Sequence, residues 1–519
     1  MYWKKYKALP EKEKRQDNYY IVGLDIGNDS SGIAFYNVAD KAPEMIDLSG
    51  GYGKPTIPTA MQYIVDTKEW VYGEYALQNN SAGKEITLKD LVERLGNSEY
   101  VDIDNKPVSI INLLGMYIKE LMSNVKNINP KAEIAGIVAS VPSYFSVHAR
   151  EELKRAFKNA GYEKELIDLV SDRECVFGYH MGNLDKDYGN DRILLIDYGA
   201  REVRGGIYEP VSTTTTSERT LKSLSALFED TIGTRMIEAQ VKKLFTSYYE
   251  KNNPLQNDRS IQEQLATFTY QHKDILFQKP IRNKPAKLYF NFAYPPFQQV
   301  VTAEDADKLI APFHKKFDKF ILQVFEKTAG KVTPADIDRV VCVGGGFEML
   351  WVKDALTSLF PQGKLHMFKN AKAVTAMGAA VVAAQLLGMT NYPAIVVEDR
   401  HQLAVDIGLK MENDSFIPLA ECNSFWWQPH HSRSFIINAP VDAGEKVPIR
   451  ILSRTPDGDV SILSDAKLEG LPKRPKGTTR LGVQLTFTSD SEGVATVLDY
   501  GFGELFPKSE FKQEIVVRL

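Results

Sequence analysis

A strand–turn–strand pattern occurs twice in this chain and constrains its fold more than any other feature. In YIVGLDIGNDSSGIAFY, residues 20–36, two apolar runs flank a turn of small polar residues that follows Asp25. In ILLIDYGAREVRGGI, residues 193–207, an apolar strand again leads to an aspartate, Asp197, and to a turn at Gly199. Glycine and small side chains let a phosphate group approach the backbone of such a turn. Two hairpins of this kind predict two similarly built lobes that face one cleft.

The composition is that of a globular protein with more than one domain. The 519 residues are 43% hydrophobic and 25% charged, with a net charge of −4. This near-neutral balance gives no reason to expect nucleic acid or an anionic membrane as the main partner. The three cysteines, Cys175, Cys342 and Cys422, have no metal-ligand spacing. Their odd number argues against a disulfide framework and favours a reducing compartment.

The ends of the sequence and its apolar runs bear on localisation. Residues 1–18 are charged and lack an apolar core, so we interpret them as a leader segment and not as a signal peptide. No apolar run reaches the roughly 18 residues that a membrane-spanning helix needs. We therefore expect a cytoplasmic protein without a membrane partner.

Residues 19–389 alternate between apolar strands and amphipathic helices, which predicts an α/β domain. Helices are expected over 85–97, 109–126 and from about Thr302 to Ala329. A buried strand at 337–343 ends in Gly344, Gly345 and Gly346, before a helix. These glycines suit the close approach of a ligand to a helix N-terminus, or they form a mere tight turn.

The texture changes after Gly388. Residues 390–402 are predicted to be an interdomain linker with one apolar patch, Ile395–Val397. In residues 403–519 short strands and turns dominate, and apolar and polar residues alternate over 481–488 as in a half-buried strand. This last region is predicted to be an all-β sandwich.

The order of these motifs resembles that of the 70-kilodalton heat-shock chaperones, the DnaK-type family, over nearly the whole chain. Residues 20–36 look like the phosphate-1 loop, residues 193–207 like phosphate-2, and VVCVGGGFEML like the adenosine motif. LEGLPKRPKGTTRLGVQLTFTSDSEGVATVLDYGFGE is similar to the peptide-binding sandwich. The resemblance implies an α/β two-lobed actin-like ATPase fold, followed by an all-β sandwich without the usual helical lid.

The resemblance also implies a nucleotide site with ATP or ADP and Mg²⁺ as cofactors. Asp25 and Asp197 match the carboxylates that hold Mg²⁺, mainly through water, and Asp172 matches a third catalytic carboxylate. The positions implied to contact the nucleotide are Gly27, Asn28, Asp29, Ser30, Gly199, Arg201, Lys273, Gly344, Gly345 and Gly346. Pro142 and Arg150 match an interlobe switch.

Several positions of this site depart from the family pattern. The phosphate-1 turn carries Asn28 and Asp29 where two threonines are usual, and the phosphate-2 turn reads Gly-Ala-Arg-Glu in place of Gly-Gly-Gly-Thr. Arg201 in that turn obstructs the backbone cradle, although it can itself pair with a phosphate. In the nucleoside pocket the departures are Tyr270, Phe277, Glu348 and Ala371. The catalytic lysine stays unassigned, with Lys84, Lys89 and Glu93 near its expected position.

These departures predict a weak ATPase and leave three outcomes open: ordinary turnover, binding with little turnover, and no binding. In the sandwich, the resemblance places Leu409, Met411, Phe435, Val447 and Ile449 in a peptide groove, and sandwich core is the alternative for each. Phe425-Trp426-Trp427 is either a contact surface or packing.

Two functions from different classes follow. The first is a chaperone-like protein whose ATP-binding domain controls a sandwich that binds unfolded or extended hydrophobic polypeptides. The alternative is a pseudo-ATPase scaffold that binds one dedicated protein partner without nucleotide turnover. A small-molecule kinase on the same fold is disfavoured, because the sandwich has no role in it.

Overall fold

The structure is a computed structural model. It describes residues 18–48, 54–78, 85–96, 98–143, 145, 147–182, 191–211, 218–253, 259–276, 285–328, 330–390, 392–398, 403, 405–411, 415–422, 424, 426, 430, 432–442, 444–455, 458–487 and 492–519. Most of the predicted leader, the end of the predicted linker (399–402), Lys84, Phe277, Phe425 and Trp427 lie outside these residues.

The chain divides into two compact units. The first unit comprises Met1–Val141 and Glu152–Glu398, and the second comprises Pro142–Glu151 and Asp399–Leu519. The boundary at Glu398 lies inside the predicted linker, and the last strand of the first unit uses linker residues.

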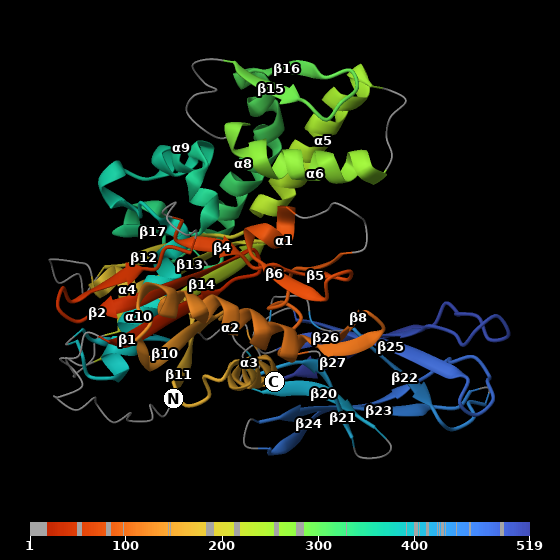
Figure 1. The fold of residues 1–519 in the computed structure, drawn as a ribbon. Coiled ribbons are helices and arrows are strands. Elements are labelled where there is room, and N and C mark those ends of the chain that lie inside the picture. Colours follow the sequence, from red (N-terminus) through yellow and green to blue (C-terminus); the bar gives the residue numbers. More distant parts are fainter. Residues whose placement is uncertain are drawn as a thin grey trace. The chain divides into compact units, whose positions relative to one another are not determined.

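The first unit contains two large mixed sheets that repeat one strand arrangement (Figure 1). The first sheet has the order β11 (Leu166–Ser171), β10 (Glu133–Val141), β1 (Tyr19–Ile26), β2 (Ser30–Asn37) and β3 (Ala42–Met45), with β4 (Thr56–Pro58) paired to β2. The second has the order β18 (Leu365–Met367), β17 (Arg339–Val343), β12 (Ile193–Tyr198), β13 (Val203–Val211), β14 (Glu218–Glu229) and β19 (Ala394–Glu398).

Both predicted hairpins are confirmed as antiparallel strand pairs, β1–β2 and β12–β13. The first strand of each hairpin runs parallel to its other neighbour, β1 to β10 and β12 to β17. The carboxyl end of that first strand carries Asp25 in one sheet and Asp197 in the other. The repeated arrangement therefore gives the two aspartates equivalent positions.

Helices and short sheets complete the first unit. The helices that lie wholly in it are α1 (Glu74–Gln78), α2 (Ile110–Ile128), α4 (Asp172–Gly182), α5 (Thr234–Asn252), α6 (Arg259–His272), α8 (Ala303–Glu326), α9 (Leu350–Leu359) and α10 (Val374–Leu386). The division into units falls within α3 (Val147–Ala160), after Glu151. The short strands are β5 (Met61–Ile64), β6 (Glu69–Tyr72), β7 (Ile86–Leu88), β8 (Tyr100–Ile103), β9 (Lys106–Ser109), β15 (Ala286–Phe290) and β16 (Phe297–Val301).

The helices predicted over 109–126 and from about Thr302 are confirmed. The α2 helix begins after Ser109, whose hydroxyl accepts a hydrogen bond from the Asn112 amide, and α8 begins with a capping box at Thr302. The helix predicted over 85–97 is wrong, because its described part forms β7 followed by turns. Asp90 there has a φ of +58°, which no right-handed helix accommodates.

The α10 helix packs directly on the first hairpin because the side chains on both contacting surfaces are small. A side chain at Gly23 would place its Cβ 2.0 Å from the Ala380 nitrogen. The facing alanines, Ala376, Ala379 and Ala380, are fully buried. This close approach holds β1, and with it Asp25, against the core of the unit.

The second unit is a sandwich of two antiparallel sheets that share one apolar core. One sheet has the order β21 (Phe416–Ala420), β20 (Asp406–Lys410), β23 (Val447–Arg454) and β24 (Val460–Leu468). The other has the order β22 (Arg433–Ile437), β25 (Thr479–Phe487), β26 (Glu492–Asp499) and β27 (Lys512–Arg518). The predicted alternation in β25 is confirmed, because Leu481, Val483, Leu485 and Phe487 are all buried.

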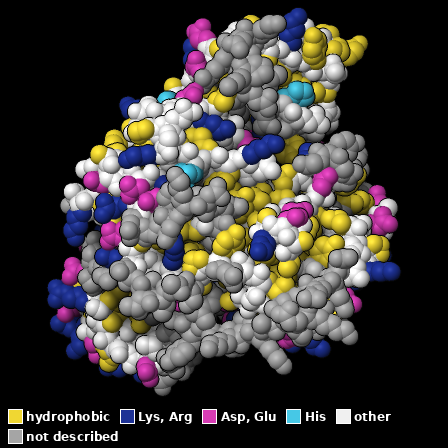
Figure 2. Space-filling model, turned by 90° about the vertical axis from the view of Figure 1, so that its left-hand side faces the viewer, with side chains coloured by type: hydrophobic (Ala, Val, Ile, Leu, Met, Phe, Trp, Pro, Cys, Tyr) yellow, Lys and Arg dark blue, Asp and Glu magenta, His cyan; other side chains and the backbone are white. Residues whose placement is uncertain are grey.

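The charged side chains on the molecular surface are of mixed sign. Figure 2 shows one face, on which Lys and Arg side chains lie interspersed with Asp and Glu side chains. Within the described residues, no helix is both long and apolar enough to cross a membrane.

Candidate functional site

The two hairpins bring Asp25 and Asp197 close to Asp172, the first residue of α4. The three carboxylates are near enough that Asp172 raises the pKa of both other groups. We call these three, together with Glu202 and Arg204 of the second hairpin, the carboxylate cluster. The structure thus assembles the three residues that the resemblance named as catalytic.

Asp25 is held by the neighbouring parallel strand. Its register partner in β10 is Ser140, whose buried hydroxyl donates a hydrogen bond of 2.5 Å to the Asp25 Oδ1. Burial raises the pKa of Asp25 to about 6, and the Ser140 hydrogen bond only partly opposes this effect. The Asp25 carboxyl therefore titrates close to neutral pH.

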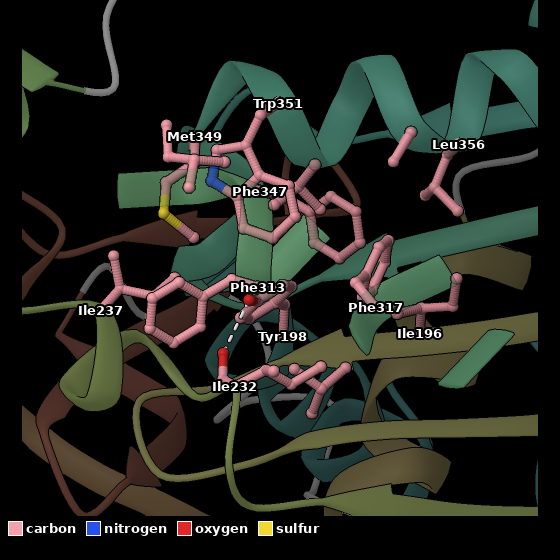
Figure 3. Close-up of a cluster of buried hydrophobic side chains, with 14 of the residues drawn as sticks. Ile196, Tyr198, Ile232, Ile237, Phe313, Phe317, Phe347, Met349, Trp351 and Leu356 are labelled. Carbon is pink, nitrogen blue, oxygen red and sulfur yellow. Dashed lines mark hydrogen bonds between the residues drawn. The ribbon is translucent and has the colours of Figure 1, made fainter. Parts of the chain in front are cut away.

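Asp197 is fixed by the residue that follows it. The Tyr198 hydroxyl donates a 2.7 Å hydrogen bond to the Ile232 carbonyl, and its ring contacts Phe317, Phe347 and Trp351 (Figure 3). Burial, with a smaller contribution from the nearby carboxylates, raises the pKa of Asp197 to about 7, although Arg204 opposes the shift. Near neutral pH this carboxyl is partly protonated.

Arg204, the arginine of the carboxylate cluster, was not among the site residues predicted from the sequence. Arg204 lies opposite Asp197 in the β12–β13 register. Its Nη1 donates to Asp172 Oδ2 and its Nε to Glu202 Oε1, each at 2.5 Å. The predicted hairpin could have indicated Arg204, because residues directly opposite each other on paired strands point to the same face of the sheet. An arginine opposite Asp197 is therefore expected to lie on the same face as this aspartate.

The carboxylate cluster does not fit the Mg²⁺ site that the resemblance implies. Mg²⁺ needs carboxylate oxygens and water in a nearly ideal octahedron. Here Asp172 and Glu202 are bonded to a guanidinium that cannot lose its charge. A divalent cation placed among these groups would be repelled by Arg204. No reaction step through Mg²⁺ follows from this arrangement.

The phosphate-1 turn is tied to the second half of the unit by Arg235 of α5. Arg235 forms an ion pair of 3.3 Å with Asp29, pairs with Asp90, and donates a 3.1 Å hydrogen bond to the Asn28 carbonyl. The turn itself is closed by a hydrogen bond from the Gly27 amide to the Ser30 carbonyl. Among the described residues, the buried Oδ1 of Asn28 has no hydrogen-bond partner.

The phosphate-2 turn is likewise held by hydrogen bonds within the turn and by contacts with other parts of the first unit. The Gly199 amide donates to the Glu202 carbonyl within the turn, and the Thr234 amide at the start of α5 donates to the Gly199 carbonyl. The Arg201 side chain forms an ion pair with Glu93. The side chain that could have met a phosphate therefore contacts a carboxylate of this chain.

The polar side chains predicted to line the nucleoside pocket also form ion pairs and hydrogen bonds with other residues of the chain. Lys273 pairs with Glu238 at 2.5 Å, and the Tyr270 hydroxyl donates to Glu74 at 2.8 Å. Glu348 pairs with Lys372 at 3.4 Å. Each of these polar side chains thus has a partner within the first unit.

The three consecutive glycines have a packing role. At Gly344, which has a φ of +93°, an added Cβ would lie 2.6 Å from the Asp197 Oδ1. At Gly346 it would lie 2.2 Å from the Tyr198 ring, and at Gly345 it would lie 2.5 Å from the Lys372 Cε. Gly344 packs against Asp197 and Gly346 packs against Tyr198. This packing is by itself a sufficient reason for glycine at both positions.

The residues predicted to form a switch and a groove lie in the second unit. The Arg150 Nε donates to the Phe145 carbonyl at 3.4 Å, within the segment Pro142–Glu151. Two of the groove residues belong to the sandwich core: Leu409 is 1% exposed and Ile449 is 6% exposed. The other three are partly buried against that core: Met411, Phe435 and Val447.

Trp426 is the described member of the aromatic triplet, and it also packs against the sandwich core. His430 hydrogen bonds to the Trp426 carbonyl at 3.2 Å, and its ring meets Phe487 edge-on. The packing interpretation therefore accounts for Trp426.

Comparison with known proteins connects this geometry to one group of relatives. The chain is 23% identical to the chaperone protein DnaK of Thermosipho melanesiensis over 496 residues, which cover 93% of this chain and 79% of that protein. It is 24% identical over 503 residues to the chaperone protein DnaK of Thermotoga petrophila, with the same coverage. The chain is thus distantly similar to DnaK over nearly its whole length.

Two family models match parts of the chain. A family of unknown function, DUF5716 (C-terminal), matches residues 42–209, and a domain of unknown function, DUF8552, matches residues 402–519. The first match contains Asp172, Asp197 and Arg204, and the second spans the sandwich strands. The similarity to DnaK therefore extends over 93% of the chain, whereas the two family models match only residues 42–209 and 402–519.

Proposed function

We propose that this chain is a chaperone-like protein whose sandwich binds extended polypeptide segments and whose first unit turns over ATP slowly or not at all. Support comes from the distant DnaK relationship over 93% of the chain, which includes both units. The observation that carries the proposal is β19, the strand that ends at Glu398, directly before the C-terminal segment of the second unit.

The β19 strand is packed into the first unit through the apolar patch of the predicted linker. It extends the second sheet by pairing in parallel with β14, with Ile395 beside Arg219. Ile395 is 4% exposed and lies in a buried cluster that includes Phe177 and Leu221. The Val397 amide donates a 3.4 Å hydrogen bond to Glu174 of α4, two residues after Asp172.

Helix α4 therefore contacts both regions: its Asp172 belongs to the carboxylate cluster, and its Glu174 accepts the hydrogen bond from β19. A change at Asp172 would act on the helix whose Glu174 receives β19. We propose that release or retention of β19 couples the first unit to polypeptide binding.

ATP or ADP with Mg²⁺ is the cofactor set that DnaK relatives suggest, and we propose that this chain binds the nucleotide weakly and without Mg²⁺ at the carboxylate cluster. Arg204, Arg201 and Lys273 are each paired with a carboxylate of the chain. A nucleotide would have to compete with these ion pairs. The same observation favours the second candidate function, a pseudo-ATPase scaffold that binds one dedicated protein partner.

The decisive experiment measures binding of a panel of fluorescent extended hydrophobic peptides to the full chain, with and without Mg²⁺ and ATP. We expect binding that Phe435→Ala weakens by about tenfold. Ile436→Ala is the matched control, because the adjacent side chain lies on the opposite, exposed face of β22. Failure of every peptide to bind would contradict the chaperone-like proposal.

The coupling is tested in the same assay with Ile395→Asp, which places a charge in the buried position of β19. Its control is Leu322→Asp, an exposed position on α8. We expect Ile395→Asp, and not the control, to change peptide affinity. Peptide affinity that is insensitive to nucleotide, together with no Asp197-dependent phosphate release, would favour the pseudo-ATPase scaffold.

A further inference from the structure

We infer that Arg204 is a tethered cation, which supplies from within the chain the positive charge that a metal ion would bring to Asp25, Asp172 and Asp197. The first unit then needs no divalent cation at this site. The inference concerns the cofactor of the first unit and does not depend on polypeptide binding by the sandwich.

The geometry of Arg204 carries this inference. Its guanidinium donates through two different nitrogens, Nη1 to Asp172 and Nε to Glu202, each at 2.5 Å. Charge-assisted bonds of this length are strong and directional. A guanidinium with a planar array of donors is suited to hold two carboxylates at fixed positions.

The position of Arg204 in the hairpin places it beside Asp197 as well as beside its two hydrogen-bond partners. It stands directly opposite Asp197, on the strand next to the one that carries this aspartate. The equivalent position of the first hairpin, opposite Asp25, is Gly32, which has no side chain. The charge is therefore added in one of the two repeats only.

The Asp172–Arg204 ion pair also joins the two halves of the first unit. Asp172 follows β11 of the first sheet, and Arg204 belongs to β13 of the second sheet. A metal held by carboxylates from both sheets would join the same halves. Here the cation cannot dissociate from the protein, because it is part of the chain.

The test is thermal unfolding of the full-length protein while MgCl₂ or MnCl₂ is titrated to millimolar concentration at constant ionic strength. Wild type is expected to show no saturable shift against an EDTA control. Arg204→Gln removes the charge and leaves the carboxylates, so this variant is expected to gain a saturable rise of about 2 °C or more with metal.

Three variants separate the cation from other effects. Arg204→Lys keeps a positive charge and is expected to stay unresponsive. Arg192→Gln breaks the Arg192–Glu209 ion pair at the other end of the same hairpin and is expected to behave as wild type. Adding Asp197→Asn to Arg204→Gln is expected to abolish the gained response. A wild-type response equal to that of Arg204→Gln would overturn the inference.

A direct measurement on natively folded protein covers the case in which Arg204→Gln does not fold. Bound Mn²⁺ is counted by electron paramagnetic resonance in wild type and in Asp197→Asn. The inference expects equal counts, because the carboxylate cluster of wild type holds no metal. A lower count in Asp197→Asn would show a metal at the cluster and would overturn the tethered cation.

Discussion

Each unit buries an aspartate beside an arginine, but the two arrangements differ in how well the carboxylate is satisfied. In the sandwich, Arg474 donates to both oxygens of Asp499, at 2.8 and 2.6 Å. Asp499 also accepts hydrogen bonds from the Gly501 amide and from the amide and hydroxyl of Ser509. In the first unit, one arginine serves four carboxylates of the carboxylate cluster.

The pKa directions follow from this difference. Burial alone would raise the pKa of Asp499, but the hydrogen bonds from Arg474, Ser509 and Gly501 lower it. Burial raises the pKa of Asp25 and of Asp197, because too few donors face them. The Arg474–Asp499 pair therefore stabilises the sandwich. The carboxylate cluster instead holds more carboxylates than its one arginine can neutralise, and such perturbed pKa values are common at functional sites.

The largest expected effect is in the sandwich. Asp499→Ala would leave Arg474 buried without its partner and should cost about 3–5 kcal/mol of unfolding free energy in the second unit. Hydrogen exchange of the β25 and β26 amides reports this change locally. As a control, Asp465→Asn removes the exposed pair with Arg450, which should cost at most about 1 kcal/mol. Equal effects of the two variants would contradict the comparison.

A smaller effect of opposite sign is expected in the carboxylate cluster. The folded pKa values of Asp25 and Asp197, about 6 and about 7, lie above the ordinary 3.8. The folded state therefore holds protons that the unfolded state releases, and the first unit loses stability as pH rises from about 4 to about 7. Asp197→Asn should stabilise the first unit by about 1–3 kcal/mol at about pH 8, and less at about pH 5.

Exchange of the β12 and β17 amides as a function of pH measures this effect. The sandwich provides the internal reference with the reverse sign: because the pKa of Asp499 is lowered, its stabilising effect is lost only as pH falls below the ordinary 3.8. Asp197→Asn that is less stable than wild type at about pH 8 would show that Arg204 fully compensates the carboxylate cluster.

The smallest effect concerns the arginine that ties down the phosphate-1 turn. Arg235→Ala removes the contacts with Asp29, Asp90 and the Asn28 carbonyl. Because these side chains are partly exposed, the cost should be about 1 kcal/mol. We expect faster hydrogen exchange in residues 27–30. Lys308→Ala, which removes an exposed pair on α8, should leave that exchange unchanged. An unchanged rate in Arg235→Ala would mean that the hairpin alone holds the turn.

Most of the fold that could be predicted from the sequence was predicted from the alternation and clustering of apolar residues in strands. Alternating apolar residues predicted β25, and the two apolar runs around each turn predicted the hairpins, because a strand has a period of two and a buried face. The helix over 85–97 failed because short apolar repeats also occur in strands and turns, and Asp90 there takes a left-handed conformation. Strand β19 lay in a predicted linker, since a lone apolar patch does not reveal its partner strand.

Residue types and their order alone identified the duplicated hairpins, the equivalent aspartates Asp25 and Asp197, and the distant similarity to DnaK. The partners of those aspartates required the folded arrangement. Arg204 of the second sheet meets Asp172 at the start of α4, and Arg235 meets Asp29 from 206 residues away. Such contacts depend on which backbones the packed core brings together, and a one-dimensional pattern records only neighbours along the chain.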